Sequence, residues 1–329
     1  MSERSMIDIS ASNGIVRVLI PLPFPLRYVN SYLIEGPDGW TVIDPGLRTI
    51  EAETLWATVL SQMGISYPSI HQIILTHHHP DHCGMAGWLQ DKTGAPVRMS
   101  AKGWEQARHM WGEDRSADGE LLSLFHQHGM EFSLQGGMRD HLTSFLPQVR
   151  PLPHVTDLKP DTEIQIGGDA WRVIETNGHA WGHLCFFQPG TREVFCGDHV
   201  LPRISPNISY TPGTDENPLA SYFEALQRMA SYEPLYAYPG HRDPFSSVGE
   251  RTDELLRHHE QRLNRMQAML ATPTSAYDLS LRFFGKELTI HTLRFAVAET
   301  IAHLIYLEQT GQVQREESNR LIMYKAILP

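Results

Sequence analysis

The N-terminal part of the chain alternates short apolar runs with turn residues. The runs are IVRVLIPLP at 15–23, NSYLIEG at 30–36 and WTVIDPG at 40–46, and a Pro-Asp-Gly turn separates the last two. Runs of this length between turn formers predict antiparallel strands. The pattern then changes to that of a helix at 51–64, and an apolar strand at 73–75 leads directly into a histidine-rich loop.

A long helix-compatible segment follows a short helix that ends at Gly94. The region at about 102–145 has no strand pattern and predicts a helical insertion. Its large apolar side chains exceed what a solvated connection requires, so we expect it to form a lid over the functional site and to bury an acyl or aromatic group. The side chains behind this expectation are Trp104, Met110, Trp111, Phe125 and Met130.

The second half of the chain returns to strands, with apolar segments at 163–177, 184–188 and 193–198 before a helix at 217–230. Two β-rich halves, each closed by helices, favour an α/β layered sandwich. After Ser247 long helices precede a terminal β-hairpin, an order that resembles a winged helix. We therefore expect a catalytic domain at 1–246 and a smaller helical domain at 247–329.

Composition narrows the class of protein. The 329 residues are 41% hydrophobic and carry a net charge of −11, which indicates a globular chain and disfavours a nucleic-acid partner. The polar first residues and the lack of an 18-residue apolar run predict neither a leader nor a membrane anchor. The cysteines are few and widely spaced, which favours buried thiols and a cytoplasmic location. They are Cys83, Cys185 and Cys196.

The 18 histidines are clustered, and the sequence THHHPDH carries the densest group. It places His77, His79, Asp81 and His82 in a loop after a strand. The alternate residues His77 and His79 can point to one side, while Asp81 and His82 turn toward a second point, so the loop can serve two metal ions. Imidazoles and carboxylates without a thiolate suit Zn²⁺ best, and Fe²⁺ or Mn²⁺ also fit.

Three further ligand-type residues each lie just beyond an apolar strand: His179 in TNGHAWGH, Asp198 in FCGDH and His241 in YPGH. Together with VIDPG at Asp44 and THHHPDH, this ordered series resembles the five motifs of the metallo-β-lactamase-fold metallohydrolases across residues 15–246. The resemblance implies an α/β fold, a four-layer αββα sandwich, to which the helical insertion and the winged-helix-like C-terminal domain are added.

The resemblance also implies roles for these residues. The implied metal ligands are His77, His79 and His179 for one ion and Asp81, His82 and His241 for the other, with Asp198 bridging them. A hydroxide between two divalent ions would be the nucleophile, and Asp81 and Asp198 would be the carboxylates of the catalytic centre. Asp44 would orient the ligand loop without touching metal.

Other histidines have less specific expectations. His78 lies off the ligand spacing and is expected to be a spacer, while His183 and His199 are expected to pack or hydrogen-bond near the site. The histidines of the insertion fit either a substrate pocket or a solvated helical surface equally well. They are His109, His126, His128 and His141.

The THHHPDH and GHAWGHLCFF segments are especially similar to glyoxalase II and to the related lactonases. This likeness predicts hydrolysis of a thioester, ester or lactone of a small molecule. The alternative is a metal-dependent endoribonuclease or phosphodiesterase, because some lactamase-like endoribonucleases carry a winged-helix-like tail. The arginines near the start of that tail alternate with acids and predict a solvated helix face with paired charges. They are Arg251, Arg257, Arg262 and Arg265.

The tail has two other conceivable roles. A winged-helix regulator needs a basic recognition helix, but the segment at 292–311 sets Arg294 against Glu299 and Glu308. The tail could instead pack against a second subunit of a homo-oligomer or cover the pocket.

Overall fold

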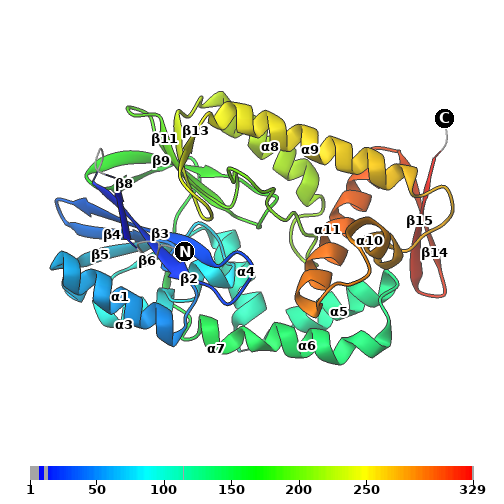
Figure 1. The fold of residues 1–329 in the computed structure, drawn as a ribbon, viewed down its shortest axis with the longest axis horizontal. Helices are drawn as coiled ribbons and strands as arrows, with labels where there is room; N and C mark the ends of the chain where they lie inside the picture. The colour runs from blue at the N-terminus through cyan, green and yellow to red at the C-terminus, as the bar shows by residue number, and fades with distance from the viewer. Residues whose placement is uncertain (1–6, 11–13, 114, 328–329) are drawn as a thin grey trace, which may run out of the picture.

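Two β-sheets face each other in the computed structural model, which describes residues 7–10, 14–113 and 115–327 (Figure 1). The first sheet has seven strands that follow one another in chain order. They are β1 (Ile7–Ser10), β2 (Ile15–Pro21), β3 (Tyr28–Gly36), β4 (Gly39–Ile43), β5 (Ile70–Ile74), β6 (Val97–Met99) and β7 (Val155–Asp157).

The second sheet has six strands in the order β13-β12-β11-β10-β9-β8. They are β8 (Glu163–Ile166), β9 (Asp169–Glu175), β10 (Leu184–Gln188), β11 (Glu193–Gly197), β12 (Tyr236–Pro239) and β13 (Phe245–Ser246). The expected hairpin at the end of the chain is confirmed as β14 (Val313–Ser318) and β15 (Leu321–Ala326), which pair with each other in antiparallel register.

The helices enclose the two sheets and extend the molecule to one side (Figure 1). They are α1 (Ile50–Met63), α2 (Pro80–Cys83), α3 (Ala86–Thr93), α4 (Ala101–Trp111), α5 (Ala117–Gln127), α6 (Gln135–Ser144), α7 (Leu146–Val149), α8 (Pro218–Ser231), α9 (Val248–Ala268), α10 (Ala276–Phe284) and α11 (Ile290–Gln309), with 3-10 turns at Tyr67–Ser69 and Phe132–Leu134.

Apolar side chains between the sheets and on their outer faces account for the four layers. Tyr32 and Ile74 of the first sheet pack against Phe186 and Phe195 of the second, in one buried cluster. Helices α1 and α3 bury their apolar residues on the outer face of the first sheet, and α8 does so on the second. The αββα sandwich expected from the sequence is therefore confirmed.

The insertion and the C-terminal helices form one helical layer beyond the sandwich. Leu121 and Phe125 of α5 and Met138 of α6 share a buried cluster with Leu279 of α10 and Leu293 of α11. Figure 1 shows α5 and α6 beside α11 and α10. The large apolar side chains of the insertion thus pack mainly against the C-terminal helices. None of the helices in the described part of the chain is long and apolar enough to cross a membrane.

The helices expected at 51–64 and 217–230 are confirmed as α1 and α8, and Gly94 ends α3 as expected. Thr49 caps the start of α1, where its side chain accepts a hydrogen bond from the Ala52 amide, and Gly64 ends the helix in the left-handed conformation. The sequence did not reveal α2, because Pro80 to Cys83 is a single helical turn inside the histidine loop. Proline at the first helical position starts this turn at little cost, since its missing N–H would have no partner there.

Candidate metal centre

The seven predicted ligands come from loops that follow β5, β9, β11 and β12. Strands β4 and β5 are parallel, as are β11 and β12, so their carboxyl ends meet at one edge of the sandwich. The structure brings all seven residues together at this edge. Ligand-type atoms lie within 4.8 Å of one another in three groups, and two of these are the expected ones, His77, His79 and His179, and Asp81, His82 and His241. The third group joins Asp44 to His77 and His82.

Asp198 lies between the two groups. Its Oδ1 is 3.5 Å from Nε2 of His82, and its Oδ2 is 3.6 Å from Nε2 of His179 and 3.4 Å from Nε2 of His241. One carboxylate therefore faces a nitrogen of the first group and two nitrogens of the second. This is the position that a bridging ligand requires.

His179 and His241 each use Nδ1 for a hydrogen bond to a backbone carbonyl. His179 Nδ1 lies 2.8 Å from the carbonyl of Asn207, and His241 Nδ1 lies 2.9 Å from the carbonyl of Tyr28. Because a carbonyl only accepts, Nδ1 carries the proton, and Nε2 is the lone-pair atom whenever the ring is neutral.

The Nε2 atoms of these rings and of His82 point toward carboxylates, and the shortest of these distances is 3.2 Å, from His241 Nε2 to Asp81. The buried Nε2 atoms of His82, His179 and His241, and Oδ1 of Asp198, have no hydrogen bond in the described part of the chain. Buried polar atoms of native proteins are almost always paired. A cluster of orphaned lone pairs that converge is the donor set a divalent cation needs, so the residues fit a metal site.

Asp44 organises the loop from behind, as expected. Its Oδ1 accepts the backbone N–H of Thr76 at 2.8 Å, and its Oδ2 accepts the Thr76 hydroxyl at 2.6 Å and His82 Nδ1 at 2.8 Å. Asp44 itself sits at a φ of 51°, which is uncommon for a residue other than glycine. Its carboxylate thus fixes both the start of the loop and the orientation of His82.

Electrostatics at the site keep three imidazoles neutral. Burial and the neighbouring histidines hold the pKa values of His77 and His79 well below their usual range, and burial lowers the pKa of His179. Neutral imidazole is the form that coordinates metal.

In the second group, the carboxylates favour the charged form of the histidine. Burial disfavours ionisation of Asp198, but the His241 and His82 imidazoles outweigh it and hold the pKa of Asp198 well below its usual range. Burial lowers the pKa of His241, but the carboxylates of Asp198 and Asp81 outweigh burial and raise it to about 10. The site therefore stabilises positive charge between these side chains.

The backbone at Gly240, next to the proposed ligand His241, passes close to the cluster. A Cβ atom at Gly240 would lie 2.3 Å from Oδ1 of Asp198 and 2.6 Å from Cε1 of His82, so only glycine leaves room for the cluster. The Asn30 side chain donates to the carbonyls of Pro239 at 2.8 Å and Arg242 at 2.6 Å. Strand β3 thereby clamps the turn that carries His241.

Sequence reasoning missed Asn30 and Asn207. Asn30 lies within a strand, and Asn207 lies in a loop far from any motif. No local pattern marks either residue, since Asn30 donates to backbone carbonyls of a distant turn and Asn207 accepts from the distant His179 with its own carbonyl.

The remaining singled-out histidines surround the cluster. His183 Nδ1 lies 2.8 Å from the Thr176 hydroxyl, and its Nε2 accepts the backbone N–H of Asp198 at 3.2 Å, so His183 supports the loop of Asp198 as expected. His199 is fully buried, and its carbonyl accepts the Tyr222 hydroxyl at 2.9 Å. His78 is also buried, but it lines the pocket, and its Nδ1 has no hydrogen bond to the residues described.

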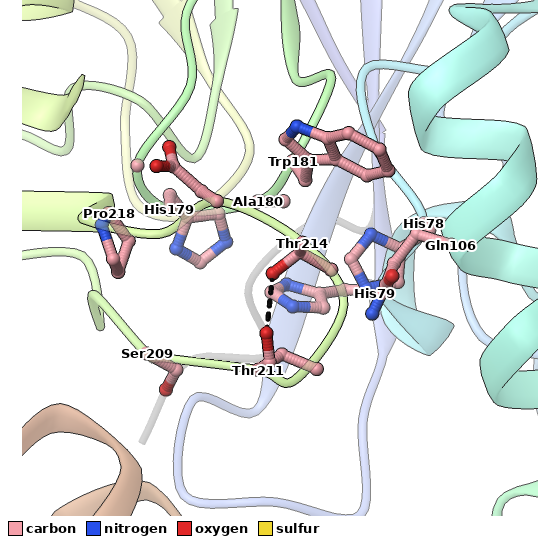
Figure 2. Close-up of a pocket in the computed structure, with 12 residues that line it drawn as sticks. His78, His79, Gln106, His179, Ala180, Trp181, Ser209, Thr211, Thr214 and Pro218 are labelled. Atoms are coloured by element: carbon pink, nitrogen blue, oxygen red, sulfur yellow. Dashed lines mark hydrogen bonds between the residues drawn. The ribbon is translucent and has the colours of Figure 1, made fainter. Parts of the chain in front are cut away.

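A pocket opens beside His79 and His179 (Figure 2). Trp181 and Gln106 flank its mouth on one side, and the loop with Ser209, Thr211 and Thr214 lies on the other. Helix α4 of the insertion therefore borders the pocket, and Trp111 Nε1 donates to the carbonyl of His78 at 3.1 Å.

The expected apolar lid surface is wrong. Four of the five side chains behind it are buried in helix packing and do not line this pocket, and Gln106 is the insertion residue that does. The four are Met110, Trp111, Phe125 and Met130.

None of the four insertion histidines is among the described residues that line this pocket, and each contacts another side chain or a carbonyl. His109 lies 3.2 Å from Glu120, and His126 Nδ1 lies 2.8 Å from the carbonyl of Met130. His128 is buried, with Nε2 3.2 Å from the hydroxyl of Tyr324 in the terminal hairpin. His141 lies against His291 of α11, with their nitrogens 3.3 Å apart. The three cysteines are free and buried, as expected.

The sandwich and the histidine–aspartate cluster at its edge define a metal-binding hydrolase fold. The chain belongs to the metallo-beta-lactamase superfamily, whose sequence model matches residues 24–241, and a second model, the metallo-beta-lactamase-like C-terminal domain, matches residues 263–327. The family expected from the motifs is thereby confirmed.

Individual relatives extend over nearly the whole chain. A metallo-beta-lactamase family protein from Thermus thermophilus superposes with a TM-score of 0.85 at 31% identity, covering 95% of this chain and 99% of that chain. A probable metallo-hydrolase from Bacillus subtilis (strain 168) is 24% identical and covers 96% of this chain and 99% of its own. An atrochrysone carboxyl ACP thioesterase from Cryptosporiopsis sp. is 23% identical over 70% of this chain and 54% of its own length.

Proposed function

We propose that this protein is a binuclear, zinc-dependent hydrolase that cleaves a thioester, ester or lactone of a small molecule. The observation that carries the proposal is the convergence of ligand-type atoms on two points with Asp198 between them. Four of these buried atoms have no hydrogen bond in the described part of the chain. One ion would be held by His77, His79 and His179 and the other by Asp81, His82 and His241, with Asp198 shared.

Two divalent ions, when bound, supply Lewis acidity and a water that is acidic enough to react at neutral pH. The chain supplies the geometry. Asn207, Tyr28 and Asp44 fix the ring orientations of three histidines, and Asp81 and Asp198 keep the anionic charge that holds the cations. In the net reaction water adds to the acyl carbon and the bond to sulfur or oxygen breaks. The products are a carboxylic acid and a thiol or alcohol.

Exposure indicates where the substrate binds. His79 and Asp81 are partly exposed, whereas His77 and His82 are fully buried. The cluster is therefore open to solvent on the side of His79 and Asp81. The pocket at this side offers the Trp181 ring and the Thr211 and Thr214 hydroxyls. A small acyl group fits such a mixed lining, and one relative is named a thioesterase.

The proposal is tested on protein purified without chelator and reconstituted with Zn²⁺, Fe²⁺ or Mn²⁺. Elemental analysis should approach two metal equivalents per chain, with the highest activity on a thioester, ester and lactone panel in the zinc form. His79→Ala should abolish turnover. His71→Gln, which alters a histidine of β5 away from the site, should retain it. One equivalent or less after reconstitution, or no turnover of the acyl panel, contradicts the proposal.

Two arginines of α9 are held in ion pairs and carbonyl contacts, which disfavours a phosphate-binding stripe on this helix. Arg251 pairs with Glu254 at 2.8 Å and donates to the carbonyls of Leu201 and Ile204, and Arg262 pairs with Glu299 of α11. For Arg262 the expected solvated pairing on its own helix is wrong, because the partner lies on another helix. RNA cleavage that disappears in His79→Ala, without acyl hydrolysis, would reverse the assignment to the endoribonuclease alternative.

A further inference from the structure

The first turns of α11 stand next to the candidate metal centre. Burial lowers the pKa values of both Arg294 and His291, and the Asp81 carboxylate acts on each in the opposite direction. Phe24, from the β2–β3 loop, stacks on His291 at 5.3 Å and lies 5.8 Å from Phe145. Phe145 also lies 6.1 Å from Trp111, which donates to the carbonyl of His78, so the loop, the insertion and α11 meet beside the histidine loop.

Arg294 is a cation without an anion at this meeting point. It has no ion pair in the described part of the chain, and its buried Nε has no hydrogen bond there. Its guanidinium lies over the rings of Phe295 at 4.2 Å and Phe145 at 5.8 Å. Burial lowers its pKa to about 10, so Arg294 remains charged at neutral pH.

Two neutral imidazoles lie close to this guanidinium. His141 and His291 approach each other to 3.3 Å between ring nitrogens, and both are only partly buried. Burial and the Arg294 charge lower their pKa values, that of His141 to about 4. A neutral imidazole can donate one hydrogen bond to an acceptor.

The charge balance of this corner indicates what it would bind. Asp81 is the carboxylate that acts on Arg294, and in the proposed function Asp81 holds a metal cation. Its negative charge would then be taken up by the metal, and Arg294 would face no compensating anion. A charge kept in partly buried surroundings without a partner is costly, so a ligand that brings a negative group gains energy there.

We propose that Arg294, with His291 and His141, forms a recognition subsite for a carboxylate on the acyl arm of the substrate. The aromatic rings of Phe145 and Phe295 lie against the flat face of the Arg294 guanidinium. The N–H groups along the edge of a guanidinium match the two oxygens of a planar carboxylate. The inference rests on the proposed acyl hydrolysis and narrows its substrate to esters or thioesters of dicarboxylic acids.

Two esters with the same leaving group and the same five-carbon acyl chain test the subsite. Mono-nitrophenyl glutarate carries the distal carboxylate, and nitrophenyl pentanoate lacks it. The metal-reconstituted protein should show kcat/KM about ten-fold or more higher for the glutarate ester, mainly through KM. Arg294→Gln should remove this preference and leave the pentanoate ester within about two-fold of the unmodified protein.

Controls separate charge recognition from packing. Arg294→Lys keeps the charge but loses the flat two-pronged donor, so it should retain part of the preference. Arg265→Gln removes an exposed arginine that also stacks on a phenylalanine, Phe283, and should change nothing. Calorimetry of glutarate binding, with pentanoate as the reference, gives a readout that does not depend on turnover.

The outcomes are distinguishable from failure of the proposed function. Equal kcat/KM for the two esters, or glutarate binding that is unchanged in Arg294→Gln, overturns the subsite. No turnover of either ester contradicts the proposed function, and the calorimetric comparison then still decides the subsite.

Discussion

The side-chain amide of Asn207 donates a hydrogen bond of 2.9 Å to Glu299, a buried carboxylate of the C-terminal helix α11. The backbone carbonyl of the same Asn207 accepts the Nδ1 proton of His179 at 2.8 Å. Glu299 also pairs with Arg262 of α9. The C-terminal helices are thus connected to a proposed metal ligand through a single residue.

Glu299→Gln should weaken metal binding at a distance from the cluster. The change leaves Arg262 partly buried without its counter-charge and loosens Asn207, so the orientation of His179 becomes less fixed. We expect metal affinity to fall by about ten-fold, as measured by competition with a chromophoric chelator. Glu308→Gln, on the same helix, should leave affinity unchanged, and equal loss in both variants would contradict the connection.

Asp198→Ala and His241→Ala should differ in metal content. Asp198 faces nitrogens of both ligand groups, whereas His241 belongs to one. We therefore expect Asp198→Ala to lower occupancy of both sites and His241→Ala to empty chiefly one, so that about one equivalent remains. Elemental analysis after reconstitution measures this, and the same loss in both variants would argue against a shared carboxylate.

Gly240→Ala should disrupt the centre although it adds only a methyl group. The new Cβ would lie 2.3 Å from Oδ1 of Asp198, a contact that forces either the carboxylate or the turn to move. We expect loss of metal and destabilisation of about 1–3 kcal/mol, measured by chelator titration and chemical denaturation. Gly249→Ala, where a Cβ meets nothing within 4 Å, is the matched control. Full metal content in Gly240→Ala would show that the close approach is not needed.

Acid should weaken the packing of α9 on α11. His259 Nδ1 and His303 Nε2 lie 3.1 Å apart in buried surroundings, and burial lowers the pKa values of these histidines to about 2 and about 3. In the unfolded chain a histidine titrates near 6.5, so below that pH the unfolded state binds protons that the folded state does not. Stability is therefore fully present above about pH 6.5 and is lost as pH falls.

The expected loss is roughly 1 kcal/mol per pH unit for each histidine, measured by urea denaturation between about pH 7 and 5. His303→Gln should show a shallower dependence on pH than the unmodified protein. The exposed His154 provides the control, because His154→Gln should leave the dependence unchanged. A slope that is identical in all three proteins would show that the buried pair does not titrate on unfolding.

The sequence by itself determined the family, the sandwich and the seven proposed ligands. His77, His79, Asp81 and His82 are close in sequence, so a strand end and one helical turn suffice to group them. Strand and helix signals are likewise local, because they depend on side-chain alternation, caps and turn residues.

Tertiary structure alone decided what surrounds the ligands. Asn30 and Asn207 act through hydrogen bonds to segments far away in the chain, and Arg294 of the C-terminal helices lies over the Phe145 ring of the insertion. No periodicity or spacing records such contacts, since they depend on how the insertion and α11 pack beside the sandwich. Packing also turned the expected apolar lid inward: Phe125 and Met130 are buried in the cluster shared with the C-terminal helices because covering those apolar helix faces removes more surface from water than lining a pocket would.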